Sequence, residues 1–524
     1  MGMRITNKIM QDNSLSNINN NKILQDKLST QMATGKKITR PSDDPVIAIR
    51  ALRLRSTLSD ITQYCDKNVE DAESWLKVTE DSINTMTGVL EDMYEQFNTG
   101  ANEHLTTANR EVILEALKEL KDEIYASGDA DYAGRGIFTG YRTSTKLRFQ
   151  EDTTLPYEIT EQVDKSVMDD ITYVKMDNGT NQIGEINAGN YTDAGYEIDD
   201  TAVSRETLHR LRLSYKDLDA DMVPTISYYD ASSAGSDPKE IPVTVVSKYD
   251  TTQDAYQAAS KMTKAGAVFI PETGEIILNE EAYKALSSTR DYASTESVDE
   301  GKISITYRKS DWKNGDLRPE HYFACTANPG TDEAIVHNGE KLNGEESQII
   351  SYDVGFNQEI RVNTLAGECY THAIGRDLDD MISILEQVGD VEKTVNTLDG
   401  IIKDDNTSNE DRVIAEKSLA AANKALTFLE EKMQKMFENG QTRMQNHLNT
   451  TTLALTSVGT RSSKLALVKT RLSSQKTNFK DLVADNEQAD TAEVATDLKS
   501  AKVAYDAALM ATGKITESTL MNYI

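Results

Sequence analysis

The sequence predicts a mainly α-helical protein with a β-rich insertion, in which both chain ends contribute to one elongated, coiled-coil-like helical bundle. Three observations lead to this prediction. Apolar residues recur every three or four positions over long stretches near both ends of the chain. This spacing disappears in the middle, where Thr, Tyr, Asp and Gly become frequent. Only 38% of the 524 residues are hydrophobic, which is low for one large globular core.

The first segment, residues 3–34, is predicted to form a helix that is only marginally stable alone. Asn17, Asn19, Asn20 and Asn21 interrupt its apolar positions. Asparagine lowers helix propensity because its side chain competes for backbone hydrogen bonds. No helix nearby in sequence is placed to cover the apolar stripe, so we expect assembly to order this segment. The stripe consists of Ile5, Ile9, Leu24, Leu28 and Met32.

A short joint follows the first helix. Glycine at position 35 can adopt the left-handed conformation that ends a helix, and a proline restricts the residue before it. Oxygen-bearing side chains at positions 42 to 44 can accept hydrogen bonds from the free amides of a new helix, whose first position suits a proline. The joint is therefore predicted to separate two helices. Its residues are Gly35, Arg40, Pro41, Ser42, Asp43, Asp44 and Pro45.

Helical spacing near 3.5 residues runs from Val46 to Asn98 with a single glycine in between. Such a run favours a long helix in a coiled-coil-like bundle, roughly 80 Å in length. A shorter helix is expected over residues 108–126. The spacing returns near Ala373 and continues, with a polar break at residues 404–410, as far as Leu472.

The last predicted helix spans residues 491–522 and is rich in alanine, a strong helix former. Its apolar stripe is shallow and suits close packing against another helix. We predict that this stripe and the stripe of residues 3–34 form the assembly interface. Its members are Val494, Leu498, Ala501, Tyr505 and Ile515.

The middle of the chain reads as strands and turns. Strand candidates are residues 171–174, 243–246 and 303–307, and residues 267–278 are predicted to form a hairpin. Four glycines between positions 128 and 140 match neither a GxGxxG loop nor a Walker loop, so hairpin turns explain them better than a phosphate site.

Three domains follow from these patterns. The terminal helices, residues 1–40 plus 485–524, are predicted to form an axial core domain. A helical rod domain is predicted from residues 44–142 plus 366–484. Residues 143–365 are predicted to form a β-rich outer domain.

Composition excludes several function classes. With 56 basic and 86 acidic residues, the formal charge is -30, which repels nucleic acid phosphates and anionic membrane surfaces. No apolar stretch is long enough for a signal peptide or a membrane-spanning helix, so we expect no membrane insertion. The three cysteines are far apart, and the six histidines show no metal-ligand spacing. No catalytic constellation is present, and we predict neither enzymatic activity nor a cofactor or metal.

Two stretches near the N-terminus carry a resemblance to a known family. Residues 3–6, Met-Arg-Ile-Thr, and residues 33–45, which end in Arg-Pro-Ser-Asp-Asp-Pro, resemble the N-terminal region of the flagellin superfamily and its hook-associated branch. Residues 136–143 are similar to the glycine-phenylalanine turn that closes the N-terminal helical part of that family. Residues 453–472 and 518–524 also resemble the hook-associated branch. The resemblance covers roughly the first 145 and last 155 residues.

The resemblance implies a structural subunit at the junction between flagellar hook and filament. It implies a homo-oligomer, contacts with a neighbouring hook-associated protein and with flagellin, and a cytoplasmic export chaperone on the C-terminal helix. It also implies type III export to the extracellular flagellum without a cleaved signal peptide. Two alternatives stay open, a filament flagellin and a surface-displayed binding module or enzyme in residues 145–365.

Overall fold

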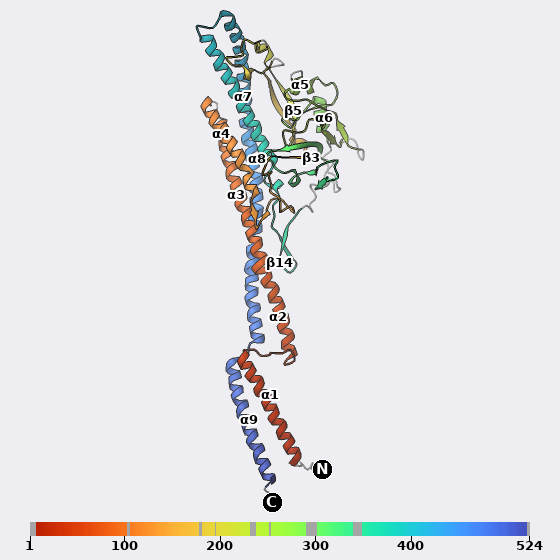
Figure 1. Ribbon diagram of the computed structural model, residues 1–524, viewed down its shortest axis with the longest axis vertical. Coiled ribbons are helices and arrows are strands. Elements are labelled where there is room, and N and C mark those ends of the chain that lie inside the picture. The colour runs from red at the N-terminus through yellow and green to blue at the C-terminus, as the bar shows by residue number, and fades with distance from the viewer. Residues whose placement is uncertain are drawn as a thin grey trace. The chain divides into compact units, whose positions relative to one another are not determined.

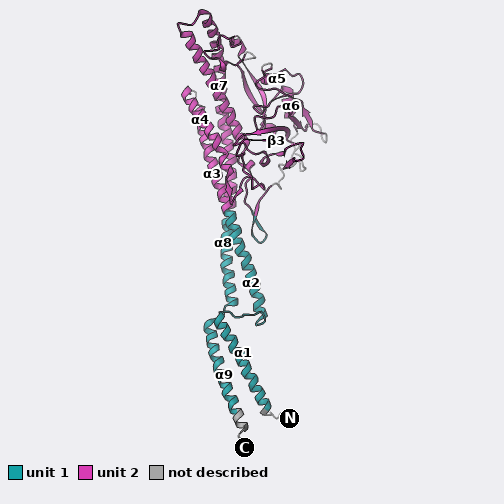
Figure 2. Ribbon diagram, viewed as in Figure 1, with its two compact units in different colours: residues 1–73, 352–360, 463–524 teal, residues 74–351, 361–462 magenta. Residues whose placement is uncertain are grey.

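The structure is a computed structural model in which the chain divides into two compact units (Figure 2). Unit 1 comprises residues 1–73, 352–360 and 463–524, and unit 2 comprises residues 74–351 and 361–462. Ile5 lies outside the described residues, as does the side chain of Ile515. The structure describes residues 7–101, 105–177, 181–193, 195–230, 237–250, 253–289, 301–338 and 348–520.

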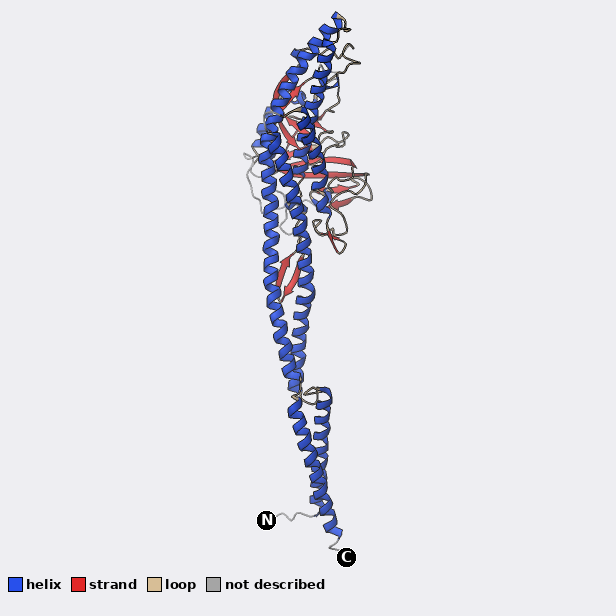
Figure 3. Cartoon of the chain, turned by 90° about the vertical axis from the view of Figure 1, so that its left-hand side faces the viewer, coloured by secondary structure: helices blue, strands red, loops and turns tan. Residues whose placement is uncertain are grey.

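Unit 1 is built mainly from helices. Helix α1 (Asn7–Thr34) packs along α9 (Thr491–Leu520), as Figures 1 and 3 show. Helix α2 (Pro45–Gln63) runs beside the C-terminal part of α8 (Asn409–Glu487), to which the ion pair between Arg55 and Glu487 joins it. A hairpin of strands β14 (Ser351–Gly355) and β15 (Gln358–Arg361) completes the unit.

The long helix predicted from Val46 to Asn98 is present in three consecutive parts. Helix α2 continues through a π-helical turn (Tyr64–Asn68) into α3 (Val69–Gly100). The spacing of apolar residues did not predict the π turn, which holds one extra residue and places Cys65 in the core. The predicted arrangement of all these helices as one elongated bundle stays a prediction.

Unit 2 contains the rest of α3, α4 (Thr107–Ile124), α7 (His372–Lys403) and the first part of α8. Helix α4 packs against α7, and α3 contacts α8 through the rings of Phe97 and Phe437, which meet edge to face at 5.9 Å. The predicted polar break is the turn between α7 and α8. The apolar residues of these helices recur at helical spacing and therefore lie on one face of each helix. These faces form the helical core.

The β-rich part of unit 2 contains two larger sheets and a short hairpin of β1 (Asp131–Tyr132) and β2 (Arg135–Gly136). The six-stranded sheet has the order β13-β12-β3-β11-β6-β7 and is antiparallel throughout. The five-stranded sheet has the order β4-β5-β10-β9-β8, with only β8 and β9 parallel. The strands of the first sheet are β3 (Thr153–Val163), β6 (Thr225–Tyr228), β7 (Lys239–Ile241), β11 (Ile303–Trp312), β12 (Ala324–Ala327) and β13 (Ile335–His337). Those of the second are β4 (Asp169–Lys175), β5 (Ser204–Arg212), β8 (Val243–Val245), β9 (Ala267–Ile270) and β10 (Glu275–Leu278).

One apolar core joins the two sheets, with Ile159 and Tyr307 from the first and Leu211 and Phe269 from the second. The other face of the five-stranded sheet is covered by α5 (Ala255–Ala258), and α6 (Glu280–Ser287) packs at the shared core. The predicted strands are present as β4, β8 and β11, and the predicted hairpin as β9 and β10. The chain is therefore mainly helical, with several sheets between its helical ends.

Candidate assembly interface

The joint after α1 begins where the backbone turns left-handed at Gly35, which has a φ of 66°. Pro45 is the first residue of α2, and the Asp44 side chain accepts hydrogen bonds from the amides of Val46 and Ile47 at 2.9 and 3.1 Å. The joint therefore contains a glycine-marked helix end and a capped helix start. This capping stabilises α2 by about 1 kcal/mol relative to an alanine at position 44.

Asp43 does not cap α2, although its position suggested that it could. Its carboxylate instead accepts hydrogen bonds from the amides of Thr39 and Arg40, at 3.1 and 2.9 Å, and from the Thr39 hydroxyl. These bonds, led by the one from the Arg40 amide, lower the pKa of Asp43. Asp43 thus holds the loop before α2 in shape. Arg40, Pro41 and Ser42 lie in this exposed loop.

The joint pairs with a second joint between α8 and α9. The Lys37 amide donates to the Glu487 carbonyl at 2.7 Å, and the Ala489 amide donates to the Gly35 carbonyl at 2.9 Å. Lys36 and Gln488 form an antiparallel bridge between these bonds. The two joints, more than 440 residues apart in sequence, are therefore one structural element.

Side chains reinforce this pairing. Glu487 forms an ion pair with Arg55 of α2, and the Glu487 side chain is only 11% exposed. Asp490 accepts hydrogen bonds from the amides of Ala492 and Glu493 and so caps α9. Sequence reasoning missed Glu487 and Asp490 as site residues. The Asp490 cap had a readable signal, because an acidic residue followed three positions later by a glutamate is typical of a helix start.

In the seam between α1 and α9, the side chains of α9 are mostly apolar and those of α1 are mostly polar. Positions on both helices that face the partner repeat with alternating steps of three and four residues, as in a coiled coil. The facing side chains of α9 include Val494, Leu498, Ala501 and Tyr505. Those of α1 are mostly polar, and only Leu28 is buried. The partly buried residues of the α1 seam are Gln11, Ser14, Ile18, Asn21 and Gln25.

Most apolar side chains of α1 point away from this seam. Ile9, Leu24 and Met32, which the sequence predicts to lie in the interface, are 48%, 46% and 44% exposed. Thus the structure brings Leu28 together with the α9 stripe but leaves the other described members of the α1 stripe uncovered. Large apolar side chains are usually buried, so this group of exposed ones is a candidate interaction surface. The exposed apolar residues of the pair are Ile9, Met10, Leu15, Ile23, Leu24, Met32, Val503, Leu509 and Met510.

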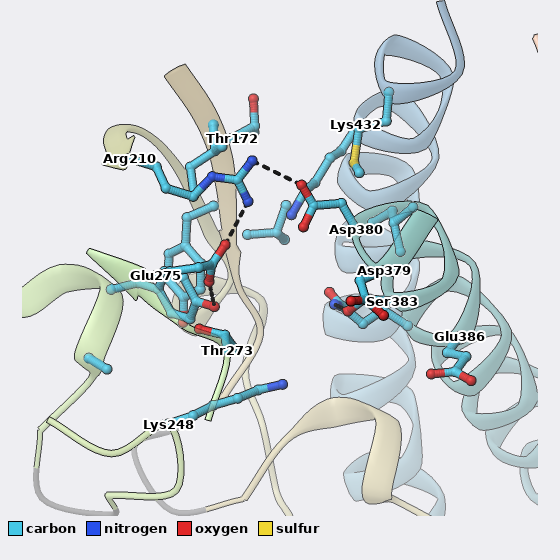
Figure 4. Close-up of a pocket in the computed structure, with 18 of the residues that line it drawn as sticks. Thr172, Arg210, Lys248, Thr273, Glu275, Asp379, Asp380, Ser383, Glu386 and Lys432 are labelled. Carbon is cyan, nitrogen blue, oxygen red and sulfur yellow. Dashed lines mark hydrogen bonds and ion pairs between the residues drawn. The ribbon is translucent and has the colours of Figure 1, made fainter. Parts of the chain in front are cut away.

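A second site of interest is a pocket of about 920 Å³ in unit 2, where the five-stranded sheet faces α7 and α8. Figure 4 shows Arg210 of β5 between two carboxylates. Its guanidinium donates to Glu275 at 2.6 Å and to Asp380 of α7 at 2.9 Å. Burial opposes ionisation of Asp380, but the Arg210 and Arg212 charges outweigh it and lower the pKa of this carboxyl. The Arg210 guanidinium is therefore paired within the chain.

The described residues hold no cluster of three or more His, Cys, Asp or Glu side chains that could bind a metal ion. Among the described helices, none has the length and apolar character needed to cross a membrane. His372 and His321 are both half-buried in unit 2. Burial lowers the pKa of His372 to about 3 and that of His321 to about 4, so both rings are neutral at pH 7.

Comparison with known proteins gives a family for the N-terminal helices. Residues 5–143 match the family model for the bacterial flagellin N-terminal helical region. In this region, the chain is similar to the flagellin superfamily. The match includes α1, the joint, α2, α3 and α4, and it ends just after the hairpin of β1 and β2.

The resemblance to the hook-associated branch is confirmed. The chain is 29% identical over 142 residues to flagellar hook-associated protein 3 of Salmonella typhimurium, which covers 27% of this chain and 44% of that protein. It is 26% identical over 144 residues to the Escherichia coli protein of the same name, covering 27% and 45%. A Clostridium tyrobutyricum flagellin is 26% identical over 122 residues, covering 23% and 32%. The matched part spans less than half the length of each of these relatives.

Two solved structures resemble the chain more loosely. The flagellar junction protein FlgL of Legionella pneumophila has a TM-score of 0.28 and 9% identity, over 84% of this chain and all of that one. FlgL of Xanthomonas campestris has a TM-score of 0.27 and 9% identity, over 82% and 99%. These scores are too low to carry an argument about function, which therefore rests on the sequence matches and on the interface itself.

Proposed function

We propose that this chain is a structural subunit of the bacterial flagellum and forms the junction between hook and filament. The observation that carries this proposal is the α1/α9 pair, in which apolar side chains such as Ile23 and Met510 are 68% and 72% exposed. Their faces have no cover within the described chain. The match of residues 5–143 to the flagellin N-terminal region supports the same role.

Assembly supplies the missing cover. The exposed faces of α1 and α9 pack against the same helices of neighbouring copies, and burial of the apolar side chains stabilises the assembled state. Contacts between different faces of identical subunits generate a ring or a helix. In this proposal residues 1–40 plus 485–524 form the axial core domain, residues 44–142 plus 366–484 the rod domain, and residues 143–365 the outer domain.

The partners in this proposal are further copies of the chain, a neighbouring hook-associated protein on one side and flagellin on the other. A cytoplasmic export chaperone covers the C-terminal helix α9 before assembly, since its apolar residues would otherwise be exposed. The chain reaches the extracellular flagellum by type III export. We assign it no catalytic role.

A second candidate function is that of a filament flagellin. The match to the Clostridium tyrobutyricum flagellin favours it. The joint sequence Arg-Pro-Ser-Asp-Asp-Pro at residues 40–45 favours the junction role, because it resembles the hook-associated branch more than filament flagellins. Purified protein that polymerises alone into long filaments would support the flagellin function.

Deletion of the gene tests the junction role. We expect mutant cells to bear hooks without filaments and to release flagellin into the medium, since flagellin has no site on which to polymerise. Normal filaments on the deletion strain would contradict the proposal. Electron microscopy and immunoblotting of the culture medium provide the measurements.

Complementation of the deletion strain tests the interface. The variant Ile23→Asp should fail to restore filaments, because a carboxylate in place of an apolar contact cannot be buried without a large cost. The matched control is Val336→Asp on β13, where valine is 69% exposed and lies outside the α1/α9 pair. Equal filament counts with both variants would show that α1 does not pack in the assembly.

A further inference from the structure

The hairpin of β14 and β15 carries the most exposed large apolar side chain among the described residues, Phe356, at 87%. Phe356 is next to Asn357, whose φ of 54° turns the chain into β15. The side chains of Val354 and Ile360 are buried, so the hairpin has a packed face and an exposed tip. An aromatic ring presented in this way resembles an anchor for a protein partner.

The hairpin is held firmly within unit 1. Asn68 of the π turn donates a hydrogen bond to the Asp353 carbonyl at 2.7 Å. Arg471 of α8 donates to the side chain of Gln358 on the other strand. Because both strands are tied to the helices, Phe356 loses little conformational freedom when a partner covers it.

Helix α2 in the same unit also has an exposed apolar face. Val46, Ile49 and Leu52 are 68%, 53% and 64% exposed, although the opposite face of α2 is packed through Ala48 and Ala51. These three side chains lie three residues apart along the helix and therefore form one apolar patch. No described part of the chain covers them.

The charges beside the two surfaces are opposite. Asp353 and Glu359 are exposed on the hairpin, and Arg50 and Arg53 are exposed on α2. None of these four side chains forms an ion pair within the described residues. The chain carries a net charge of -30, so copies repel one another overall. The acidic hairpin of another copy is therefore attracted most strongly to a basic patch such as the one on α2.

We propose that the hairpin of one copy docks on the exposed face of α2 of a second copy. Phe356 packs among Val46, Ile49 and Leu52, while the hairpin carboxylates pair with the two arginines. Because the hairpin and the α2 face are different surfaces, the contact is heterologous and repeats from copy to copy. This inference rests on the proposed function, since it adds a second contact to the assembly that α1 and α9 drive.

Disulfide crosslinking in assembled flagella tests the contact. Cells expressing a Phe356→Cys, Ile49→Cys double variant are treated with a mild oxidant, and their isolated flagella are analysed by non-reducing gel electrophoresis. We expect a ladder of covalent multimers of this chain that requires both cysteines. The three native cysteines are buried and do not interfere. The control pairs Phe356→Cys with Leu467→Cys on α8, a position 75% exposed, and should give no ladder.

The outcomes separate this inference from the junction role. If the chain is present in isolated flagella but the double variant gives no more ladder than the control, the hairpin contact is wrong and the junction role stands. If the wild-type chain is absent from flagella, both proposals fail. Motility under reducing conditions shows whether the cysteine variants fold and assemble.

Charge reversal gives a second readout. Arg53→Glu should reduce the crosslinked fraction about twofold to fivefold, as expected for an exposed ion pair. Adding Glu359→Arg restores the opposite charges and should recover the ladder. If the crosslinked fraction stays the same in both variants, the proposed docking of the hairpin on α2 is wrong.

Discussion

Arg212 of β5 donates a hydrogen bond of 2.6 Å from Nη2 to Oδ1 of Asp377 on α7. The Asp377 side chain is 6% exposed and also accepts hydrogen bonds from Arg443 and His447 of α8, at 2.8 and 2.9 Å. Burial opposes its ionisation, but the His447 hydrogen bond and the two arginine charges outweigh burial and hold the pKa of Asp377 well below its usual range. One buried carboxylate thus ties a strand of the insertion to the helices that follow it.

The variant Asp377→Asn should destabilise unit 2 by about 2–3 kcal/mol, because it removes the buried negative charge that Arg212, Arg443 and His447 share, although Arg212 keeps its ion pair with Asp380. Urea unfolding, followed by the fluorescence of Trp312 in a Trp75→Phe background, measures the change. The matched control is Glu197→Gln, whose ion pair with Lys417 is exposed to solvent and should contribute little to stability. Equal shifts of the unfolding midpoint would show that the Asp377 contacts add little.

The lowered pKa values of His372 and His321 predict a loss of stability in acid. The folded chain holds His372 and His321 neutral, with pKa values of about 3 and 4, whereas the unfolded chain takes up protons near pH 6.5. The stability that each neutral histidine contributes is therefore fully present above pH 6.5. It decreases as the pH falls toward 4, by on the order of 2–3 kcal/mol for each histidine. Thermal unfolding between pH 7 and pH 4.5 tests this.

A variant separates His372 from other acid-sensitive groups. His372→Phe should reduce the acid sensitivity, since the ring already lies among Tyr215, Tyr322 and Phe323. His209→Asn is the control, because hydrogen bonds to Glu280 and Asp170 outweigh burial and raise the pKa of His209. Its contribution is present below pH 6.5 and is lost as the pH rises, which is the opposite direction. An unchanged pH profile for His372→Phe would contradict the assignment.

Two glycines of α8 should respond differently to alanine. A Cβ at Gly440 would lie 2.3 Å from the ring of Phe97, so Gly440→Ala must displace a buried ring and should destabilise the helical core by about 1–3 kcal/mol. A Cβ at Gly459 meets nothing within 4 Å, so Gly459→Ala should stabilise the helix by about 0.5–1 kcal/mol. Denaturant unfolding monitored by circular dichroism would show shifts in opposite directions. Shifts in the same direction would mean that α3 and α8 do not approach so closely.

The terminal helices should be the least protected part of the monomer. Among the described side chains of their seam, Leu28, Val494 and Ala501 are the buried ones, which is a small core for two helices of about thirty residues. We expect fast amide exchange in residues 1–40 and 485–524 and slower exchange in the helical core of unit 2. Hydrogen exchange mass spectrometry of a verified monomer measures both. Strong protection of the two ends would contradict assembly-dependent ordering.

The polar side of the α1 seam provides a matched pair of variants. Asn21→Leu faces α9 and should slow exchange in both terminal helices, because it adds an apolar contact to the seam. Asn19→Leu lies on an exposed position of the same helix and should leave exchange across the seam unchanged. Similar exchange for the two variants would show that the seam does not limit the stability of the pair.

Local patterns predicted much of the secondary structure. The helix from Val46 onward, the break between α7 and α8 and the hairpin of β9 and β10 all appear where spacing and turn residues place them. The π turn was not predicted, since one extra residue hardly changes the spacing of apolar positions. Of the three residues predicted as possible caps of α2, Asp44 occupies the capping position, whereas Asp43 binds the preceding loop.

The sequence by itself determined where helices begin and end, because caps, prolines and periodic apolar residues act on neighbours within a few positions. It also determined, by its acidic composition and its joint residues, which classes of function to consider. Only the tertiary structure decided that Lys37 pairs with Glu487 and that Ile23 of α1 faces outward. It also brought Arg212 to Asp377. These relationships join residues far apart in the chain, or select one face of a helix among several, and local spacing contains no information about the partner.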